Sequence, residues 1–225
     1  MRIAILGGTG PAGQAMAARL ASVGFDTTIG SRDATRAAEV RDHLVAKWSQ
    51  YGLPIGAADN EAAAANCDHV ILATPWDIAA ETARSVATLL RGKVVISMAN
   101  ALFRVGHEFQ PLVPPRGSVA GNVQAAVPGA LVAAAFHHVP AKDVGNLNGH
   151  IDSDVLICSD HPVATQVAST IANRVPGLRA LDAGELSNAL AIEAFAAVLL
   201  QLNHRYKAKV AVKLTGIGAD PRLET

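Results

Sequence analysis

The sequence has few aromatic residues and no net charge, and both shortages narrow what the chain can be. Only 4% of its 225 residues are aromatic while half are hydrophobic, and alanine dominates the stretches with helical periodicity. This composition is typical of a densely helical α/β protein. Nineteen basic residues balance nineteen acidic ones, so the charge does not favour binding to nucleic acid or to an anionic membrane.

Cysteine is also scarce, and the chain shows no secretion signal. Cys67 and Cys158 stand alone, without a C-x-x-C pair or metal-ligand spacing, so we expect buried thiols in a reducing compartment. The N-terminus does not have the layout of a signal peptide. The most apolar stretch, residues 189–202, is too short to cross a bilayer and contains Glu193, which we expect to be paired or at the rim of the fold. These features predict a cytoplasmic protein.

The clearest motif lies in the first thirteen residues, MRIAILGGTGPAG. The apolar run 3–6 predicts a strand buried on both faces, and an alanine-rich helical stripe follows the glycines. Between them lies a G-x-G-x-x-G pattern, whose tight turn brings main-chain N–H groups and a helix N-terminus close to a pyrophosphate. We therefore expect dinucleotide contacts from Gly8, Thr9, Gly10, Pro11, Ala12 and Gly13. The alternative is a glycine turn without a ligand.

A second spacing of the same glycines has to be considered. Positions 7, 10 and 13 also fit the G-x-x-G-x-x-G of short-chain dehydrogenases, whose catalytic tyrosine is followed four residues later by lysine. The only tyrosines are Tyr51 and Tyr206, and neither has that lysine. Short-chain dehydrogenase chemistry is therefore excluded.

Basic residues follow the second expected strand, where NAD-binding folds place an acidic residue on the ribose. The strand ends at Gly30 and Ser31, followed by Arg32 and, one helical turn later, Arg36. A hydroxyl and two guanidinium groups suit a 2′-phosphate, which a carboxylate would repel. The pattern predicts NADP, with a solvated basic helix start as the alternative. Asp33 is the expected helix N-cap.

Two later strands also end in polar or aromatic residues. Thr74 and Trp76 flank a proline after one strand, and Asn100 follows the next. Since parallel strands end at one edge of the sheet, we expect all three near the dinucleotide. Trp76 has an alternative role as a cover on the adjacent helix.

The adjacent histidines His137 and His138 make a poor metal pair. On the extended segment that we expect there, neighbouring side chains point to opposite sides. No carboxylate or cysteine stands at a ligand spacing to complete a site, so no metal is expected. We expect one histidine to line the cleft and the other to be satisfied within the fold.

The order of elements predicts a Rossmann-type α/β fold with a doubly wound, mostly parallel sheet and a small C-terminal helical appendage. Strands are expected at 25–29, 70–73, 93–97, 131–136, 155–158 and 178–181, and helices at 34–48, 60–66, 78–90, 119–126 and 162–175. The glycines and prolines around 52–56 and at 103–117 predict loops.

The C-terminal part is expected to be helical and to form contacts between subunits. Asp182 and Glu185 have the spacing of a capping box, which predicts a long helix behind them. Residues 194–200 are apolar on nearly all sides, so a partner subunit is the economical explanation and we expect a homodimer. The chain then divides into an NADP-binding domain, 1–181, and a segment for dimerisation and cleft closure, 182–225, in which residues 207–225 fold back towards the cleft.

Together these motifs resemble the coenzyme F420-dependent NADP reductases. The resemblance covers nearly the whole chain and rests on GGTGPAG at 7–13, GSR with Arg36, TPW at 74–76, HHVPA at 137–141, LDAGELSN at 181–188 and AVKLTG at 211–216. It implies an oxidoreductase that exchanges a hydride between NADP and the deazaflavin F420, with these two small molecules as its cofactors.

The resemblance also implies roles for particular residues. Residues 9–12 match the family's turn over the cofactor phosphates, and Ser31, Arg32 and Arg36 match its 2′-phosphate clamp. Trp76 matches an aromatic residue beside the dinucleotide. The segment that holds both rings matches His137, Val139, Pro140 and Ala141, and Val210 falls where the family's C-terminal segment touches the deazaflavin.

The implied reaction agrees with the missing acid–base pair. Hydride transfer between two stacked rings needs alignment and exclusion of water, and no carbonyl has to be protonated. No catalytic residue is certain, and His137 is the only candidate acid or base. Two alternatives remain open: an NADPH-dependent flavin or ferric reductase of the same fold, and a non-catalytic NADP-binding sensor.

Overall fold

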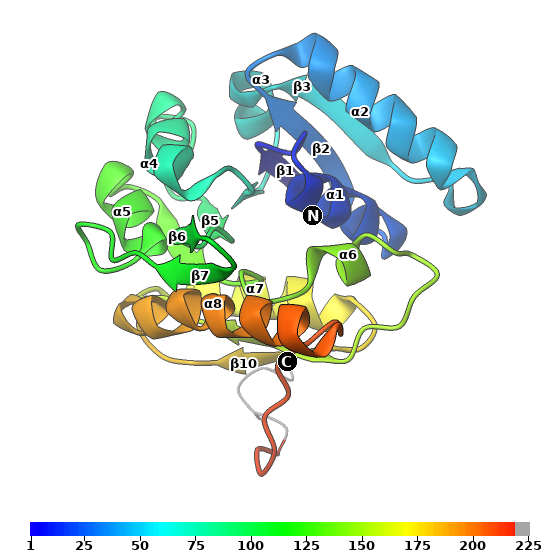
Figure 1. Cartoon of the computed structure of the whole chain (residues 1–225). Coiled ribbons are helices and arrows are strands. Elements are labelled where there is room, and N and C mark those ends of the chain that lie inside the picture. Colours follow the sequence, from blue (N-terminus) through cyan, green and yellow to red (C-terminus); the bar gives the residue numbers. More distant parts are fainter. Residues whose placement is uncertain (219–225) are drawn as a thin grey trace.

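A six-stranded parallel sheet forms the centre of the protein (Figure 1). The computed structural model describes residues 1–218. The strand order is β3-β2-β1-β4-β5-β8, with β1 Arg2–Leu6, β2 Asp26–Ser31, β3 Ile55–Asp59, β4 His69–Leu72, β5 Val94–Ser97 and β8 Leu131–Ala134. The order reverses beside β1, and ligands of doubly wound sheets bind at such a switch point. The Rossmann-type fold class is confirmed.

Helices cover both faces of the sheet because β1 is apolar on both sides. Ile3 and Ile5 belong to one buried cluster, with α1 Pro11–Ser22, α2 Ala34–Lys47 and α7 Pro162–Arg174. Ala4 and Leu6 belong to the other, with α3 Asn60–Ala65, α4 Trp76–Ser85 and α5 Val119–Ala126. Successive side chains of a strand point to opposite faces, so β1 joins the two halves of the core.

A second, smaller unit lies beside this sheet (Figure 1). It contains the parallel pair β9 Ser153–Ile157 and β10 Leu178–Asp182, with α7 packed on it, and the C-terminal helix α8 Ala189–Tyr206 runs alongside. The short helix α6 Ala141–Val144 packs against α1. A backbone bridge between Ala134 and Cys158 connects the unit to β8. The division at residue 181 stays a prediction.

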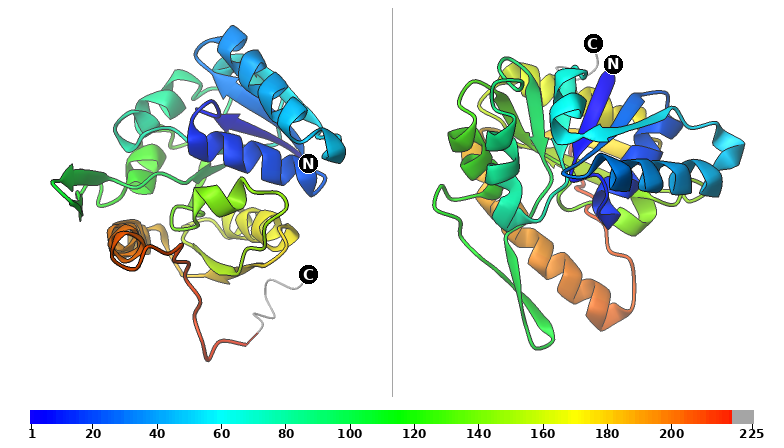
Figure 2. Two further views of the ribbon diagram at one scale, coloured as in Figure 1. Left: turned by 45° about the vertical axis from the view of Figure 1, so that its right-hand side comes forward. Right: turned by 90° about the horizontal axis from the view of Figure 1, so that it is seen from above.

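Both stretches that were expected to be loops contain strands. Residues 55–59 form β3, which pairs with β2 at the edge of the sheet, and residues 102–111 form an antiparallel hairpin of β6 Leu102–Val105 and β7 Glu108–Pro111. The glycines and prolines were misleading because an edge strand tolerates them where tertiary pairing supplies the hydrogen bonds. The hairpin projects from the body of the protein (Figure 2).

The expected capping box before α8 is wrong. Asp182 accepts a hydrogen bond from the Gly184 N–H, and a short 3₁₀ turn, η2 Leu186–Asn188, separates Glu185 from α8. The Leu186 N–H donates instead to Asp160. Another 3₁₀ turn, η1 Ser49–Tyr51, follows α2.

The C-terminal helix is longer than the apolar stretch seen in the sequence. Residues Leu186–Tyr206 are long and apolar enough to cross a membrane by length and composition. In the fold this helix packs against β7 and α5, and its Glu193 is buried. Of the final segment 207–225, residues 219–225 lie outside the described part of the chain.

The two cysteines are buried, unpaired thiols, as expected. Burial raises the pKa of both, that of Cys158 to about 12, so neither is a ready thiolate.

Candidate functional site

The glycine turn, residues 7–13, connects β1 to α1 at the switch point of the sheet. Gly7 has φ +74°, a conformation that favours glycine, and Gly10 is the N-cap of α1 without a side-chain cap. Pro11 is the first residue of the helix, as the sequence predicted. The N–H groups at the start of α1 are therefore available to an anion.

Close backbone packing explains two of the glycines. A Cβ atom on Gly13 would lie 2.5 Å from the Gly8 Cα, and one on Gly8 would lie 2.7 Å from the Ile5 carbonyl oxygen. A Cβ on Gly10 would meet only the Gly7 carbonyl oxygen at 3.6 Å, an ordinary contact. Gly8 and Gly13 thus bring the helix against the strand, whereas Gly10 leaves space above the turn.

The basic residues after β2 lie close to this turn in the fold. The Gly8 N–H donates to the Gly30 carbonyl oxygen at 3.1 Å, so the end of β2 touches the turn. Asp33 caps α2 by accepting from the N–H groups of Thr35 and Arg36, which confirms the predicted N-cap. Arg32 is exposed, and among residues 1–218 its guanidinium forms no ion pair.

The same holds for Arg36, which is also exposed and has no ion-pair partner in the described part of the chain. The Ser31 hydroxyl is engaged locally, where it accepts from the Asp33 N–H at 3.2 Å. Two free guanidinium groups beside an available helix N-terminus suit a phosphate.

The carboxyl ends of β4 and β5 present buried polar atoms that lack partners. Thr74 Oγ1, Ser97 Oγ and Asn100 Oδ1 are buried and have no hydrogen-bond partner within the described residues. Thr74 also adjoins the glycine turn, since a Cβ on Gly7 would lie 2.5 Å from its Cγ2. Buried polar atoms are normally satisfied, so this edge is suited to a polar ligand. Ser97 was not singled out as a site residue from the sequence.

Trp76 takes a position compatible with either of its expected roles. It is the first residue of α4, directly behind Thr74 and Pro75 at the carboxyl end of β4. Its ring is partly buried and packs against the core cluster of α3, α4 and α5.

A pocket of about 140 Å³, here called the His137 pocket, brings together the other predicted residues. Its lining includes every residue of the 137–141 segment, together with Asn100 and Val210. The Asn100 Nδ2 donates to the His137 carbonyl oxygen at 2.6 Å, which ties the end of β5 to this segment. Helix α8 closes the pocket with Ala196, Leu199, Leu200 and Asn203.

The residues of α8 were missed as site residues by the sequence reasoning. Their apolar character indicated only a buried helix or a subunit contact. The sequence contains one further indication, because Asn203 is a polar residue in an apolar helix. In the structure, the Asn203 Oδ1 accepts a hydrogen bond from the Val210 N–H at 2.5 Å.

The expected orientation of the two histidines is wrong. Residues 137 and 138 lie in a turn after β8, where Phe136 has φ +64°, and not in an extended segment. Their rings are 5.0 Å apart in an edge-to-face arrangement, and both are buried. The turn therefore brings to one side two rings that an extended chain would separate.

The two rings differ in their contacts. His138 Nε2 lies 3.0 Å from the Asp154 carbonyl oxygen and 3.2 Å from the Leu156 N–H. Neither ring nitrogen of His137 has a partner within residues 1–218, and burial, with a smaller effect of His138, lowers the pKa of His137 to about 3. Both histidines therefore line the pocket: His137 is neutral near pH 7, and His138 is also held by hydrogen bonds to β9.

Ala141 lies between this pocket and the glycine turn. It lines the His137 pocket and also a neighbouring cavity of about 320 Å³, which Pro11 and Gln14 of α1 share. The buried Arg19 of α1 fixes this arrangement by donating to the carbonyl oxygens of Val144 and Asn146 at the end of α6. Burial lowers the pKa of Arg19. Arg19 and Gln14 were not predicted from the sequence.

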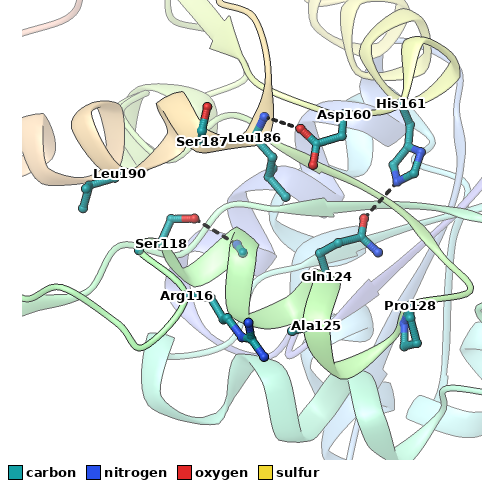
Figure 3. Close-up of a pocket in the computed structure, with 12 residues that line it drawn as sticks. Arg116, Ser118, Gln124, Ala125, Pro128, Asp160, His161, Leu186, Ser187 and Leu190 are labelled. Atoms are coloured by element: carbon teal, nitrogen blue, oxygen red, sulfur yellow. Dashed lines mark hydrogen bonds between the residues drawn. The ribbon is translucent and has the colours of Figure 1, made fainter.

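A larger cavity, of about 680 Å³, lies elsewhere in the described part of the chain (Figure 3). Its walls come from α5, from the loop before α7 and from η2, with Gln124 and His161 hydrogen-bonded at 3.1 Å. No predicted site residue lines it. The residues that the sequence predicts for the site gather at the glycine turn and the His137 pocket, and not at this larger cavity.

Comparison with known proteins gives a consistent result. Residues 2–101 match the family model described as NADP oxidoreductase, coenzyme F420-dependent. F420-dependent NADP reductases from Methanocaldococcus jannaschii and Methanothermobacter marburgensis are 35% and 33% identical over 222 residues, covering 96% of this chain and 99% of each relative. A crystal structure described as a candidate F420-dependent NADP reductase from Arthrobacter sp. FB24 superposes with a TM-score of 0.79 at 26% identity, over 96% of this chain and 99% of that one.

Proposed function

The chain belongs to the F420-dependent NADP reductase family, and from this we propose that it transfers a hydride directly between NADP(H) and coenzyme F420. The observation that carries the proposal is the His137 pocket, which adjoins the glycine turn through Ala141 and is closed by small and apolar side chains. NADP and F420 supply the hydride chemistry, and the protein aligns them and excludes water.

In the proposed NADP site, backbone N–H groups bind the pyrophosphate and charged side chains bind the 2′-phosphate. The N–H groups of Thr9 and Ala12 hold the pyrophosphate at the start of α1, where Pro11 has no N–H and that of Gly10 donates to the Gly7 carbonyl oxygen. Close packing of Gly13 on Gly8 brings the turn near the phosphates. Arg32 and Arg36 bind the 2′-phosphate, with Ser31 between them and the turn. Gly8, Gly10 and Gly13 give the turn its shape.

The carboxyl edge of β4 and β5 then receives the nicotinamide end of NADP. Thr74 Oγ1 and Asn100 Oδ1 are buried atoms without partners among the described residues, so they fit the polar edge of a ligand. Trp76 covers the dinucleotide from the start of α4.

The deazaflavin ring binds against the His137 pocket, on the side of the glycine turn. Val139, Pro140 and Ala141 line this pocket together with Val210 and residues of α8. A neutral, buried His137 with a pKa of about 3 is a weak base, so it shapes the pocket without acting as a proton carrier. No general acid is needed for transfer between two rings.

The protein acts as a homodimer in this proposal. Exposed apolar residues gather on α8 and on the hairpin that packs beside it, with Phe195 and Val198 40% and 48% exposed and Phe103 59% exposed. The hairpin projects beyond the body in the region of α8, which fits a surface for a second copy (Figure 2). Sedimentation at micromolar concentration should show a dimer that Val198→Glu dissociates.

We place the enzyme in the cytoplasm, with the two small-molecule cofactors as its partners. The placement in the cytoplasm is supported by the apolar helix 186–206, which packs within the fold. Its Glu193 accepts hydrogen bonds from N–H groups of α5.

An assay of acceptors tests the function. Purified protein with NADPH should reduce F420, and FMN or a ferric chelate should be reduced at least about 100-fold more slowly, since ring alignment controls the rate. Preferred reduction of FMN or iron would support the reductase alternative. NADP binding without turnover of any acceptor would support the sensor.

A further inference from the structure

The segment after α8 has little apolar anchoring of its own. We call residues 209–217 the C-terminal strap; it has no helix or strand, and only Val212 is buried. Val210 nevertheless lines the His137 pocket. The polar contacts that hold the strap must therefore determine where this part of the pocket wall lies.

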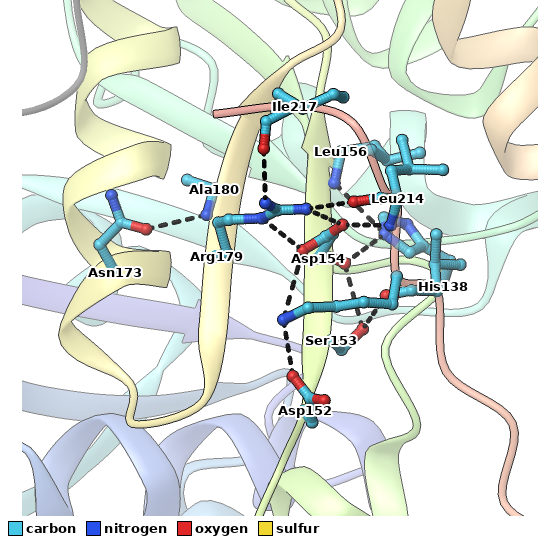
Figure 4. Close-up of polar contacts among 12 residues, drawn as sticks. His138, Asp152, Ser153, Asp154, Leu156, Asn173, Arg179, Ala180, Leu214 and Ile217 are labelled. Atoms are coloured by element: carbon cyan, nitrogen blue, oxygen red, sulfur yellow. Dashed lines mark hydrogen bonds and ion pairs between the residues drawn. The ribbon is translucent and has the colours of Figure 1, made fainter. Parts of the chain in front are cut away.

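Several of those contacts meet at one residue of β9, Asp154 (Figure 4), whereas the N–H of Val210 itself donates to Asn203 of α8. Its carboxylate accepts from the Leu214 N–H at 2.6 Å, and its own N–H donates to the Val212 carbonyl oxygen at 2.7 Å. Two positions of the strap are thus fixed by the side chain and the backbone of a single residue.

The carboxylate is fully buried and held by a guanidinium from the neighbouring strand β10. Arg179 donates to it through Nε at 2.8 Å and Nη2 at 2.7 Å, and Nη2 also donates to the Leu214 carbonyl oxygen at 2.6 Å. Burial raises the pKa of Asp154, but Arg179, the Leu214 N–H and Lys213 together lower it below its usual value. The carboxylate is therefore ionised, and a buried charge of this kind depends on its partner.

Asp154 also contacts the pocket from its other side. Its carbonyl oxygen lies 3.0 Å from His138 Nε2, and His138 lines the His137 pocket. Asp154 therefore contacts both the strap, which contains Val210, and His138 of the 137–141 segment. Neither Asp154 nor Arg179 itself lines the pocket.

We propose that Asp154 and Arg179 are a positioning pair that holds the C-terminal strap and His138 in place, and so sets the shape of the deazaflavin side of the site. The proposal rests on the proposed function for the identity of the ligand. The pair acts on F420 and not on NADP, because its contacts are with His138 and with the strap at Val212 and Leu214, and none of the contacts that the structure describes is with the glycine turn.

The test compares the two cofactors in Asp154→Asn. This nearly isosteric variant removes the charge that binds Arg179, and it should raise the KM for F420 by about 10-fold while the KM for NADPH changes less than about 2-fold. Amide hydrogen exchange of residues 210–214 should become faster. The matched control Asp152→Asn removes an exposed ion pair with Lys213 of the same strap but leaves Asp154 and its partners in place, and it should change neither KM.

Arg179→Lys keeps the positive charge but loses the two-pronged contact, so it should give an intermediate KM for F420. It also serves as the measurement if Asp154→Asn does not fold. An unchanged KM for F420, or an equal rise of both KM values, would overturn the positioning role. If the wild-type protein binds NADP but does not reduce F420, the proposed function is wrong. The positioning role is tested separately, because unchanged amide hydrogen exchange of the strap in both variants would refute it.

Discussion

The glycine turn and the His137 pocket adjoin each other at Ala141 but are built differently. The turn is seven consecutive residues, shaped by backbone packing of Gly13 on Gly8. The pocket is assembled from β5, the 137–141 segment, α8 and the strap, and long-range hydrogen bonds such as Asn100 to His137 hold these parts together. Damage to the turn should therefore weaken the whole fold, whereas the pocket can change while the fold persists.

Gly13→Ala is the substitution with the largest expected effect, because it should damage the glycine turn and with it the stability of the whole fold. Its Cβ would press on the Gly8 Cα at 2.5 Å, so α1 must move away from β1. We expect the free energy of unfolding to fall by about 4 kcal/mol, measured by urea denaturation, with loss of NADP binding. The control Gly10→Ala meets only an ordinary contact at 3.6 Å and should keep the stability of the wild type. Equal stability of the two variants would contradict the role assigned to Gly13.

Protonation should affect α8, which lines the His137 pocket, whereas residues 7–13 contain no titratable side chain. Burial raises the pKa of Glu193 in α8 to about 7, against the lowering effect of hydrogen bonds from the N–H groups of Val119 and Ala120. Since the folded state favours the protonated form, the contribution of Glu193 to the free energy of unfolding is greatest below pH 4.5 and is lost as the pH rises to about 7.

That loss should amount to roughly 3 kcal/mol, at about 1.4 kcal/mol per unit of pKa difference. Denaturation of the wild type and of Glu193→Gln, which cannot ionise, isolates the effect from other titrating groups. The difference in stability between the two proteins should change between pH 4.5 and 7 and stay constant above. A constant difference over the whole range would show that Glu193 does not have a raised pKa.

Ala141→Leu changes the junction of the two regions. The larger side chain would fill space between them and separate the two rings, so turnover should fall about 100-fold while the dissociation constant for NADP stays within about 2-fold. Lys142→Leu, at the exposed neighbouring position, is the control and should leave turnover unchanged. Unaltered turnover in Ala141→Leu would remove Ala141 from the site.

Arg32→Ala has the smallest expected effect and concerns the turn side. Loss of a charge-assisted contact to the 2′-phosphate should weaken NADP binding by about 10-fold and NAD binding by less than about 2-fold, measured by titration calorimetry. The partly exposed Arg41 of α2, the helix that follows Arg32, offers a control. Equal weakening of both dinucleotides would contradict the assignment of the phosphate site.

The difference between the contiguous glycine turn and the His137 pocket, which is assembled from distant segments, explains how much of the fold and of the site could be predicted from the sequence. The glycine turn and the Asp33 cap follow from local patterns, because consecutive residues determine them. The 137–141 segment was placed by resemblance, but its histidines were assigned to opposite sides since the turn at Phe136 depends on tertiary packing. Neither the residues of α8 nor Asp154 and Arg179 have a local signature, because their roles arise from tertiary contacts, such as the ion pair between Asp154 and Arg179, which are 25 positions apart.

Direct transfer of the hydride is the central claim, and isotopic labelling tests it most directly. NADPH deuterated at C4 of the nicotinamide, incubated with the enzyme and F420 in ordinary water, should give reduced F420 that carries the deuterium. Such a result requires the two rings to meet in the space between the glycine turn and the His137 pocket. Reduced F420 without the label, with deuterium released to water, would contradict direct transfer and with it the alignment of the two sites.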